Sequence, residues 1–141
     1  MVPVVQSEKA ARARVLVAED SDNIRESLVE LFGDEATVVA AATLRDALSA
    51  LREHAFDLVI ADLRLGNKAD AGLQIMATAS LLSPDAPVVA LTAYASTAAR
   101  AASKRLGAAH FLPKPADLVH IALLAAEVGV SSTLAHAARE F

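Results

Sequence analysis

The chain has 141 residues, of which 55% are hydrophobic, and its formal net charge at pH 7 is −4. This length and composition fit one domain with a sizeable core, and the negative charge gives no reason to expect nucleic-acid binding through bulk electrostatics. The absence of cysteine excludes disulfides, thiol nucleophiles and cysteine zinc sites. No apolar stretch approaches the ~20 residues of a membrane span, and residues 1–5 are too few for a signal-peptide core, so we expect a cytoplasmic protein.

Strand and helix signals alternate along most of the chain. Residues 1–13 lack a clear period and are expected to form a flexible leader. Short apolar runs then predict five strands, at residues 14–18, 36–41, 58–62, 87–92 and 109–112. Apolar residues at helical spacing predict a helix after each strand, beginning near residues 22, 43, 72, 96 and 117. Strict alternation implies right-handed crossovers, so we expect an α/β fold with a parallel sheet covered on both faces.

The first predicted helix has recognisable signals at both of its ends. Ser21 can cap its N-terminus, and Gly33 can end it. Ile24, Leu28 and Leu31 recur at helical spacing and are expected to form its apolar face.

The run at residues 58–62 is apolar until it ends in Asp62. Such a run is typical of a strand buried on both faces of a parallel sheet. Ligands of open α/β sheets bind beyond the carboxyl ends of the strands, where Asp62 would lie. We therefore interpret Asp62 as a nucleophilic carboxylate that accepts a phosphoryl group, the alternative being an acid that merely ends a strand.

Other polar residues follow the remaining predicted strands and would share the same edge of the sheet. They are Glu19, Asp20, Thr92 and Lys114. Three clustered carboxylates repel one another unless a cation is present, and Mg²⁺ prefers such oxygen ligands. Lys114 could pair with phosphoryl oxygens, and Thr92 could donate a hydrogen bond to them. Taken singly, each residue has an ordinary structural explanation, such as a helix N-terminal acid or a solvated lysine.

With these residues in place, the sequence resembles a response-regulator receiver domain of two-component signalling. The matching segments are residues 17–20, 59–65, 91–94 and 107–115, and the resemblance covers about residues 14–127. It implies a flavodoxin-like, doubly wound sheet of five parallel strands in the order 2-1-3-4-5. The remaining residues, 128–141, are expected to be a linker or a short extra helix.

The resemblance also implies roles for individual residues. Asp62 is implied to be the phosphoacceptor, and Glu19 and Asp20 are implied to hold Mg²⁺ (or Mn²⁺) together with Asp62 and the backbone carbonyl of Arg64. Thr92 is implied to contact the phosphoryl group.

Further implied roles concern the phosphoryl contact and the switch. Lys114 would contact the phosphoryl group, and the bond from Lys114 to Pro115 is expected to be cis. Thr92 and Phe111 would form the switch pair. Arg64 and Tyr94 occupy the positions that tune dephosphorylation, and we expect their bulk to shield the acyl phosphate from water.

Partners follow from the same resemblance. A histidine kinase or histidine phosphotransfer protein would donate the phosphoryl group, and the chain's own chemistry would be limited to self-phosphorylation and self-dephosphorylation. The signal would pass to a protein target through the face formed by residues 96–106, 109–112 and 117–127, which could also form a homodimer. No direct nucleic-acid or membrane contact is expected from this chain.

Two departures from the family pattern affect the site. The loop between Asp62 and Gly72 is two residues longer than the commonest spacing, and Gly66 stands where proline is usual. Phe111 lacks the hydroxyl of the more usual tyrosine.

Three other functions compete with a stand-alone phosphoacceptor. The chain could be the receiver fragment of a DNA-binding transcription regulator. It could be an aspartyl-phosphate hydrolase, but that class usually has a second acid two residues after the nucleophile, where this chain has Arg64. It could also be a degenerate receiver that binds partners without phosphate, which the complete set of acids argues against.

Overall fold

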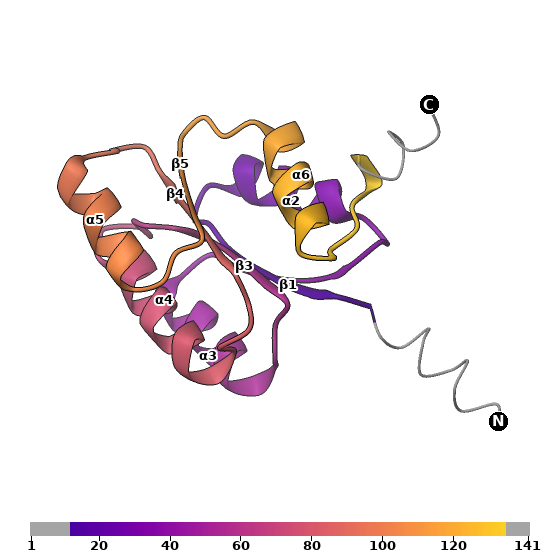
Figure 1. Cartoon of the computed structure of the whole chain (residues 1–141), viewed down its shortest axis with the longest axis horizontal. Helices are drawn as coiled ribbons and strands as arrows, with labels where there is room; N and C mark the ends of the chain where they lie inside the picture. The colour runs from indigo at the N-terminus through magenta and orange to yellow at the C-terminus, as the bar shows by residue number, and fades with distance from the viewer. Residues whose placement is uncertain (1–11, 135–141) are drawn as a thin grey trace, which may run out of the picture.

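The computed structural model describes residues 12–134, which alternate between strand and helix (Figure 1). The strands are β1 (Arg14–Ala18), β2 (Thr37–Ala41), β3 (Leu58–Asp62), β4 (Val88–Thr92) and β5 (His110–Pro113). The helices are α2 (Asp22–Phe32), α3 (Leu44–Glu53), α4 (Ala71–Leu82), α5 (Thr97–Arg105) and α6 (Leu118–Glu127). The predicted boundaries of the strands and helices differ from these by one residue or less at most ends.

All strand pairs are parallel, and the strand order is β2-β1-β3-β4-β5. Helices α3, α4 and α5 cover one face of the sheet, and α2 and α6 cover the other (Figure 1). The parallel sheet covered on both faces, which strand and helix alternation predicted, is therefore confirmed, and so are the doubly wound fold and the strand order that the resemblance implied.

Burial across the sheet follows the position of each strand. Every residue of β3 and β4 is buried, because both strands have neighbours on either side and helices on both faces. The edge strands β2 and β5 are only partly buried. Successive residues of β3 alternate between the two cores: Val59 packs on the α3–α4–α5 side and Ile60 on the α2–α6 side. The carboxyl ends of these strands are therefore held by well-packed cores on both faces of the sheet.

The beginning of α2 differs from the prediction in two details. Ser21 is the N-cap residue, but its hydroxyl makes no capping hydrogen bond; instead its backbone N–H donates to the carboxylate of Glu19 at 3.0 Å. Ile24 is 37% exposed, whereas Leu28 and Leu31 are buried as predicted.

The chain after α6 packs back onto the end of α2. Val130 is buried, and the hydroxyl of Thr133 donates to the backbone oxygen of Leu31 at 2.8 Å. The predictions for residues 1–11 and 135–141 lie outside the described residues. Within residues 12–134, no helix combines the length and the apolar character needed to cross a membrane.

Candidate functional site

The carboxyl edge of the sheet gathers three of the predicted site residues into direct contact. Glu19 follows β1, Asp62 ends β3, and Lys114 follows β5. The Lys114 Nζ atom lies 2.5 Å from Glu19 Oε1 and 2.6 Å from Asp62 Oδ2. Residues that are 52 and 95 positions apart in sequence thus share one ion-pair network, which is the convergence that the strand ends predicted.

Asp20 joins this network as a third carboxylate. Oxygen atoms of Glu19, Asp20 and Asp62 lie within 4.8 Å of one another. Glu19 and Asp62 are buried, whereas Asp20 is exposed. One lysine ammonium balances only one of three negative charges, so the residual charge and the all-oxygen donor set fit a hard divalent cation. The cluster is therefore a candidate divalent-metal site.

Backbone N–H groups orient each of the three carboxylates. Arg64 donates to Asp62 Oδ1 at 3.2 Å, and Gly66 donates to Asp20 Oδ2 at 2.9 Å. Ser21 provides the corresponding bond to Glu19. These bonds come from the turns that follow β1 and β3, so the loops as well as the strands set the direction of the oxygen atoms.

The charges of the network shift the proton affinities of its members. Burial raises the pKa of Glu19 above its usual value of 4.5, and the hydrogen bonds from Lys114 and Ser21 only partly offset this effect. Burial acts to lower the pKa of Lys114, but the hydrogen bonds to Asp62 and Glu19 outweigh it, so this pKa is raised. Lys114 is thus a cation at neutral pH, placed directly beside Asp62.

Asp20 behaves differently because it is nearer to solvent. Burial acts to raise its pKa, but the hydrogen bond from the Gly66 N–H, together with smaller contributions, outweighs this and lowers the pKa. Asp20 therefore carries its negative charge over a wide range of pH, as a metal ligand must.

Thr92 ends β4 and is buried. Its hydroxyl oxygen accepts a hydrogen bond from the Tyr94 N–H at 2.9 Å, and its backbone oxygen accepts one from the Lys114 N–H at 2.7 Å. The peptide bond between Lys114 and Pro115 is cis, as expected. Thr92, at the end of β4, and Lys114, directly after β5, therefore lie at the same edge of the sheet and are joined by a backbone hydrogen bond.

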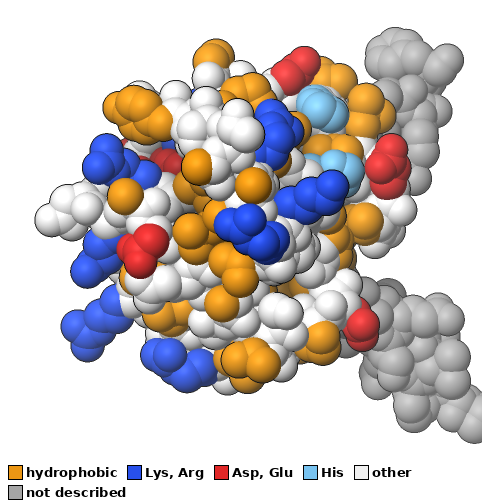
Figure 2. All heavy atoms as spheres, turned by 60° about the vertical axis from the view of Figure 1, so that its left-hand side comes forward, with side chains coloured by type: hydrophobic (Ala, Val, Ile, Leu, Met, Phe, Trp, Pro, Cys, Tyr) orange, Lys and Arg blue, Asp and Glu red, His pale blue; other side chains and the backbone are white. Residues whose placement is uncertain are grey.

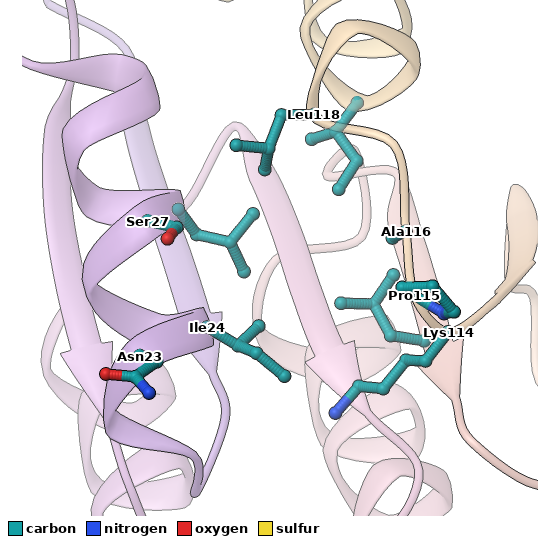
Figure 3. Close-up of a pocket in the computed structure, with 10 residues that line it drawn as sticks. Asn23, Ile24, Ser27, Lys114, Pro115, Ala116 and Leu118 are labelled. Atoms are coloured by element: carbon teal, nitrogen blue, oxygen red, sulfur yellow. The ribbon is translucent and has the colours of Figure 1, made fainter.

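The aliphatic stem of Lys114 lines an apolar pocket of about 260 Å³ between α2 and the connection from β5 to α6 (Figure 3). Ile24 of α2 and Leu118 of α6 both line this pocket, while the Lys114 nitrogen points toward the strand ends. The pocket explains why Ile24 remains exposed.

Arg64 and Tyr94 lie together at the mouth of a second pocket, of about 280 Å³. The guanidinium carbon of Arg64 is 5.9 Å from the centroid of the Tyr94 ring, a cation–π geometry. The Tyr94 side chain is largely exposed, at 72%. The pocket is lined by Leu63, Arg64, Ala69, Thr92, Tyr94 and Ala99. Both residues expected to tune dephosphorylation thus border the space next to Thr92.

Phe111 lies on the same face of the sheet as Thr92 but does not line that pocket. It is half-buried, and the guanidinium carbon of Arg100 in α5 is 4.6 Å from its ring centroid.

The sequence analysis did not predict the contacts of two residues, Arg100 and Gly66. Nothing in the helical spacing of α5 indicated that Arg100 would meet a strand residue. Gly66 stood out as a departure from the family pattern, but its hydrogen bond to Asp20 spans 46 positions and depends on how the loop folds.

The sequence profile of the response regulator receiver domain matches residues 15–125. The response regulator protein PilR of Pseudomonas aeruginosa is 31% identical over 109 residues, which are 77% of this chain and 24% of PilR. This chain thus spans about a quarter of the length of that relative.

Solved structures agree with this match. A response regulator from Burkholderia pseudomallei, with a phosphorylated aspartic acid, a calcium ion and citrate, is 31% identical, with a TM-score of 0.70 over 91% of this chain and 71% of that one. The non-phosphorylated HemR receiver domain from Leptospira biflexa is 35% identical, with a TM-score of 0.73 over 83% of this chain and 94% of that one. The chain belongs to the family of response regulator receiver domains.

Proposed function

We propose that this receiver domain is a phosphorylation switch in which Asp62 accepts a phosphoryl group from the phosphohistidine of a histidine kinase or phosphotransfer protein. The observation that carries the proposal is the position of the Asp62 carboxylate, 2.6 Å from the Lys114 ammonium and within the cluster of three acids. We further propose that the protein acts in the cytoplasm and signals by protein contact.

In the proposed transfer, a carboxylate oxygen of Asp62 attacks phosphorus while the bond from phosphorus to the donor's imidazole nitrogen breaks. The electron pair of that bond stays on the nitrogen, and Asp62 becomes an acyl phosphate. Because the transferred group carries its charge on peripheral oxygens, positioning and neutralisation do most of the catalysis. Lys114 supplies a fixed positive charge, and the Thr92 hydroxyl can donate a hydrogen bond to a phosphoryl oxygen.

The residues that would hold Mg²⁺ (or Mn²⁺) are Glu19, Asp20, Asp62 and the backbone carbonyl of Arg64. A divalent ion there would screen the carboxylates from the incoming phosphoryl oxygens. The phosphorylated aspartic acid and calcium ion of the Burkholderia pseudomallei regulator support both parts of this proposal, since that protein is 31% identical to this chain.

The proposed output depends on Thr92 and Phe111. When the Thr92 hydroxyl moves toward the phosphoryl group, space for the Phe111 ring would open on the same face of the sheet. The ring's movement would change the surface formed by α5, β5 and α6, which we propose as the contact surface for a protein target or for a second copy of the chain. Such a switch is a local charge event that biases a two-state element.

Incubation with acetyl phosphate and Mg²⁺, followed by intact-protein mass spectrometry, tests the proposal. Wild type should gain one phosphoryl group, and Asp62→Asn should gain none. Asp85→Asn is the matched control, because Asp85 is an exposed aspartate in the turn before β4 at the opposite edge of the sheet. Incorporation that persists in Asp62→Asn would remove Asp62 from its proposed role.

A second candidate function is that of the receiver part of a longer transcription regulator. The alignment with only 24% of PilR favours it. Immunoblotting of the native protein would decide between them, since a regulator with an output domain would migrate far above the 14.6 kDa of this chain.

A further inference from the structure

The loop from β3 to α4 contains a small hairpin. The Leu65 N–H donates to the Lys68 oxygen at 3.2 Å, and the Lys68 N–H donates to the Leu65 oxygen at 3.0 Å. Gly66 is the first central residue of this turn and has a φ of +60°. A two-residue turn with positive φ at this position is a normal closure for a tight hairpin, and glycine adopts it without strain. The longer loop thus has a defined structure.

Gly66 also contacts the acid cluster directly. Its N–H donates to Asp20 Oδ2 at 2.9 Å. Lack of room does not explain the glycine, because a Cβ atom added there would meet nothing within 4 Å. Proline, the residue expected here from the family pattern, has no N–H and a φ near −65°, so it could neither make this bond nor fit this turn.

The hydrogen bond from Gly66 restricts the side chain of Asp20, which is less constrained by its surroundings than the side chains of the other two acids. Glu19 and Asp62 are buried and both bind Lys114, whereas Asp20 is exposed and lies at the solvent side of the cluster. An exposed aspartate samples several rotamers, and fixing one of them costs conformational entropy when a ligand binds. A hydrogen bond to one carboxylate oxygen holds the side chain while the other oxygen stays available.

We infer that Gly66 is a positioning residue, whose N–H holds the Asp20 carboxylate in the orientation that binds the divalent ion. The inference rests on the proposed function, since it takes the three acids as metal ligands. In this chain the hairpin of the longer loop does the orienting. The same hairpin follows Arg64, whose N–H is held by Asp62 Oδ1, so both loop contacts to the acids depend on its fold.

Calorimetric titration with Mg²⁺ at fixed pH tests this inference without measuring phosphorylation. Gly66→Pro removes the N–H donor and the positive φ, and we expect its Kd for Mg²⁺ to rise about tenfold, equivalent to about 1.4 kcal/mol. Gly66→Asn keeps the N–H and tolerates positive φ better than most residues, so its Kd should rise by less than about threefold. The melting temperatures without metal should show both variants folded.

The outcomes separate this inference from the proposed function. If wild type binds no Mg²⁺, or if Asp20→Asn binds it as tightly as wild type, the proposed metal site fails. If wild type binds Mg²⁺ and Gly66→Pro binds it equally well, the positioning role of Gly66 is overturned. Equal weakening in Gly66→Pro and Gly66→Asn would also overturn it, because the N–H would not be the cause.

A second measurement remains decisive if Gly66→Pro does not fold. The Gly66 amide should be protected from hydrogen exchange in wild type, and Asp20→Ala should exchange it about tenfold faster. The amide of Lys68, whose acceptor is the Leu65 carbonyl rather than Asp20, is the internal reference and should change little. Equal exchange of the Gly66 amide in wild type and Asp20→Ala would overturn the inference.

Discussion

At the scale of single residues, two electrostatic effects oppose each other in the acid cluster: repulsion between the carboxylates and their attraction to Lys114. Glu19 and Asp62 are almost completely buried, and the Lys114 ammonium between them, together with one backbone N–H donor to each carboxylate, offsets their repulsion. Removal of one partner from such a network leaves a buried charge without compensation, which costs far more than an exposed ion pair contributes. The acid cluster therefore contributes little to stability, which agrees with the proposal that it binds a cation and a phosphoryl group.

The raised pKa of Glu19 predicts how stability depends on pH. The Glu19 carboxyl stays protonated to a higher pH in the folded protein than in the unfolded chain. The contribution of Glu19 to the free energy of unfolding should therefore fall as pH rises from 4.5 through the pKa of the folded protein. Glu19→Gln cannot ionise, so without metal its stability relative to wild type should be more favourable at pH 7 than at pH 4.5. Urea unfolding in the presence of a chelator measures the difference, and the opposite trend would contradict the account.

The contact between Arg64 and Tyr94 predicts a slow loss of the phosphoryl group. Both side chains border the pocket beside Thr92. We expect the water that hydrolyses the acyl phosphate to approach through this pocket. The double substitution Arg64→Ala and Tyr94→Ala should speed the decay of the acyl phosphate about fivefold, equivalent to about 1 kcal/mol. The measurement is the decay of phosphorylated protein after removal of donor, with the exposed Arg45→Ala as control. An unchanged decay rate would count against shielding.

The sequence predicted that the three acids, Thr92 and Lys114 lie at one edge of the sheet. The carboxyl ends of parallel strands meet there, independently of the path of the loops. Gly66 and Arg100 could not be predicted in the same way. The contact of Gly66 with Asp20 depends on the path of the loop after β3. The contact of Arg100 with Phe111 depends on how α5 packs over β5. Residue spacing along the sequence indicates neither contact.

At the scale of elements, α5 has the most distinctive surface. Lys and Arg side chains gather on the face of the molecule that α5 forms (Figure 2), and this helix contains Arg100, Lys104 and Arg105. The protein as a whole is negatively charged, so this face differs in sign from the net charge. Arg100 links the surface to the interior because it stacks on Phe111.

This stacking predicts that Arg100 biases the position of the Phe111 ring. Inward movement of the ring would end the contact, so Arg100→Gln should raise the inward population about threefold, in keeping with the strength of an exposed cation–π pair. Fluorine NMR of protein labelled with fluorophenylalanine, with the Phe111 signal assigned by substitution, would report the shift. Arg105→Gln, on the same helix, is the control; the same shift in both variants would contradict a role for Arg100.

The bounds of the strands were predicted most accurately where a strand is buried on both faces of the sheet. The continuous apolar runs of β3 and β4 reflect their burial on both faces, so their boundaries were clear. The start of α2 was less clear. Helical spacing placed Ile24 on the buried face, but Ile24 lines the open pocket beside Lys114. Ser21 donates through its backbone N–H to Glu19 and makes no capping bond with its hydroxyl.

At the scale of the whole molecule, the segment after α6 contacts the C-terminal end of α2 through Thr133. Thr133 donates to the oxygens of Glu30 and Leu31, backbone groups at the end of α2 that the helix itself leaves unpaired. Gly33, with a φ of +54°, lets the chain turn directly beneath Thr133, where a Cβ atom would come within 2.4 Å of the Thr133 methyl group.

Thr133→Val should therefore lower the free energy of unfolding by about 1 kcal/mol, the usual net value of a hydrogen bond, while leaving phosphorylation of Asp62 unchanged. Chemical denaturation measures the stability. Ser96→Ala is a useful comparison, because it removes a helix cap of similar value at the opposite end of the molecule. A Thr133→Val variant as stable as wild type would show that the segment is not part of the cooperative unit.

The central claim is that Asp62 carries the phosphoryl group. Borohydride reduces an acyl phosphate to an alcohol, so treatment of the phosphorylated protein followed by peptide mass spectrometry locates the modified side chain. The account predicts reduction at Asp62 alone, dependent on a divalent cation and greatly diminished in Lys114→Met. Reduction at Asp20 or Glu19 in place of Asp62 would contradict it.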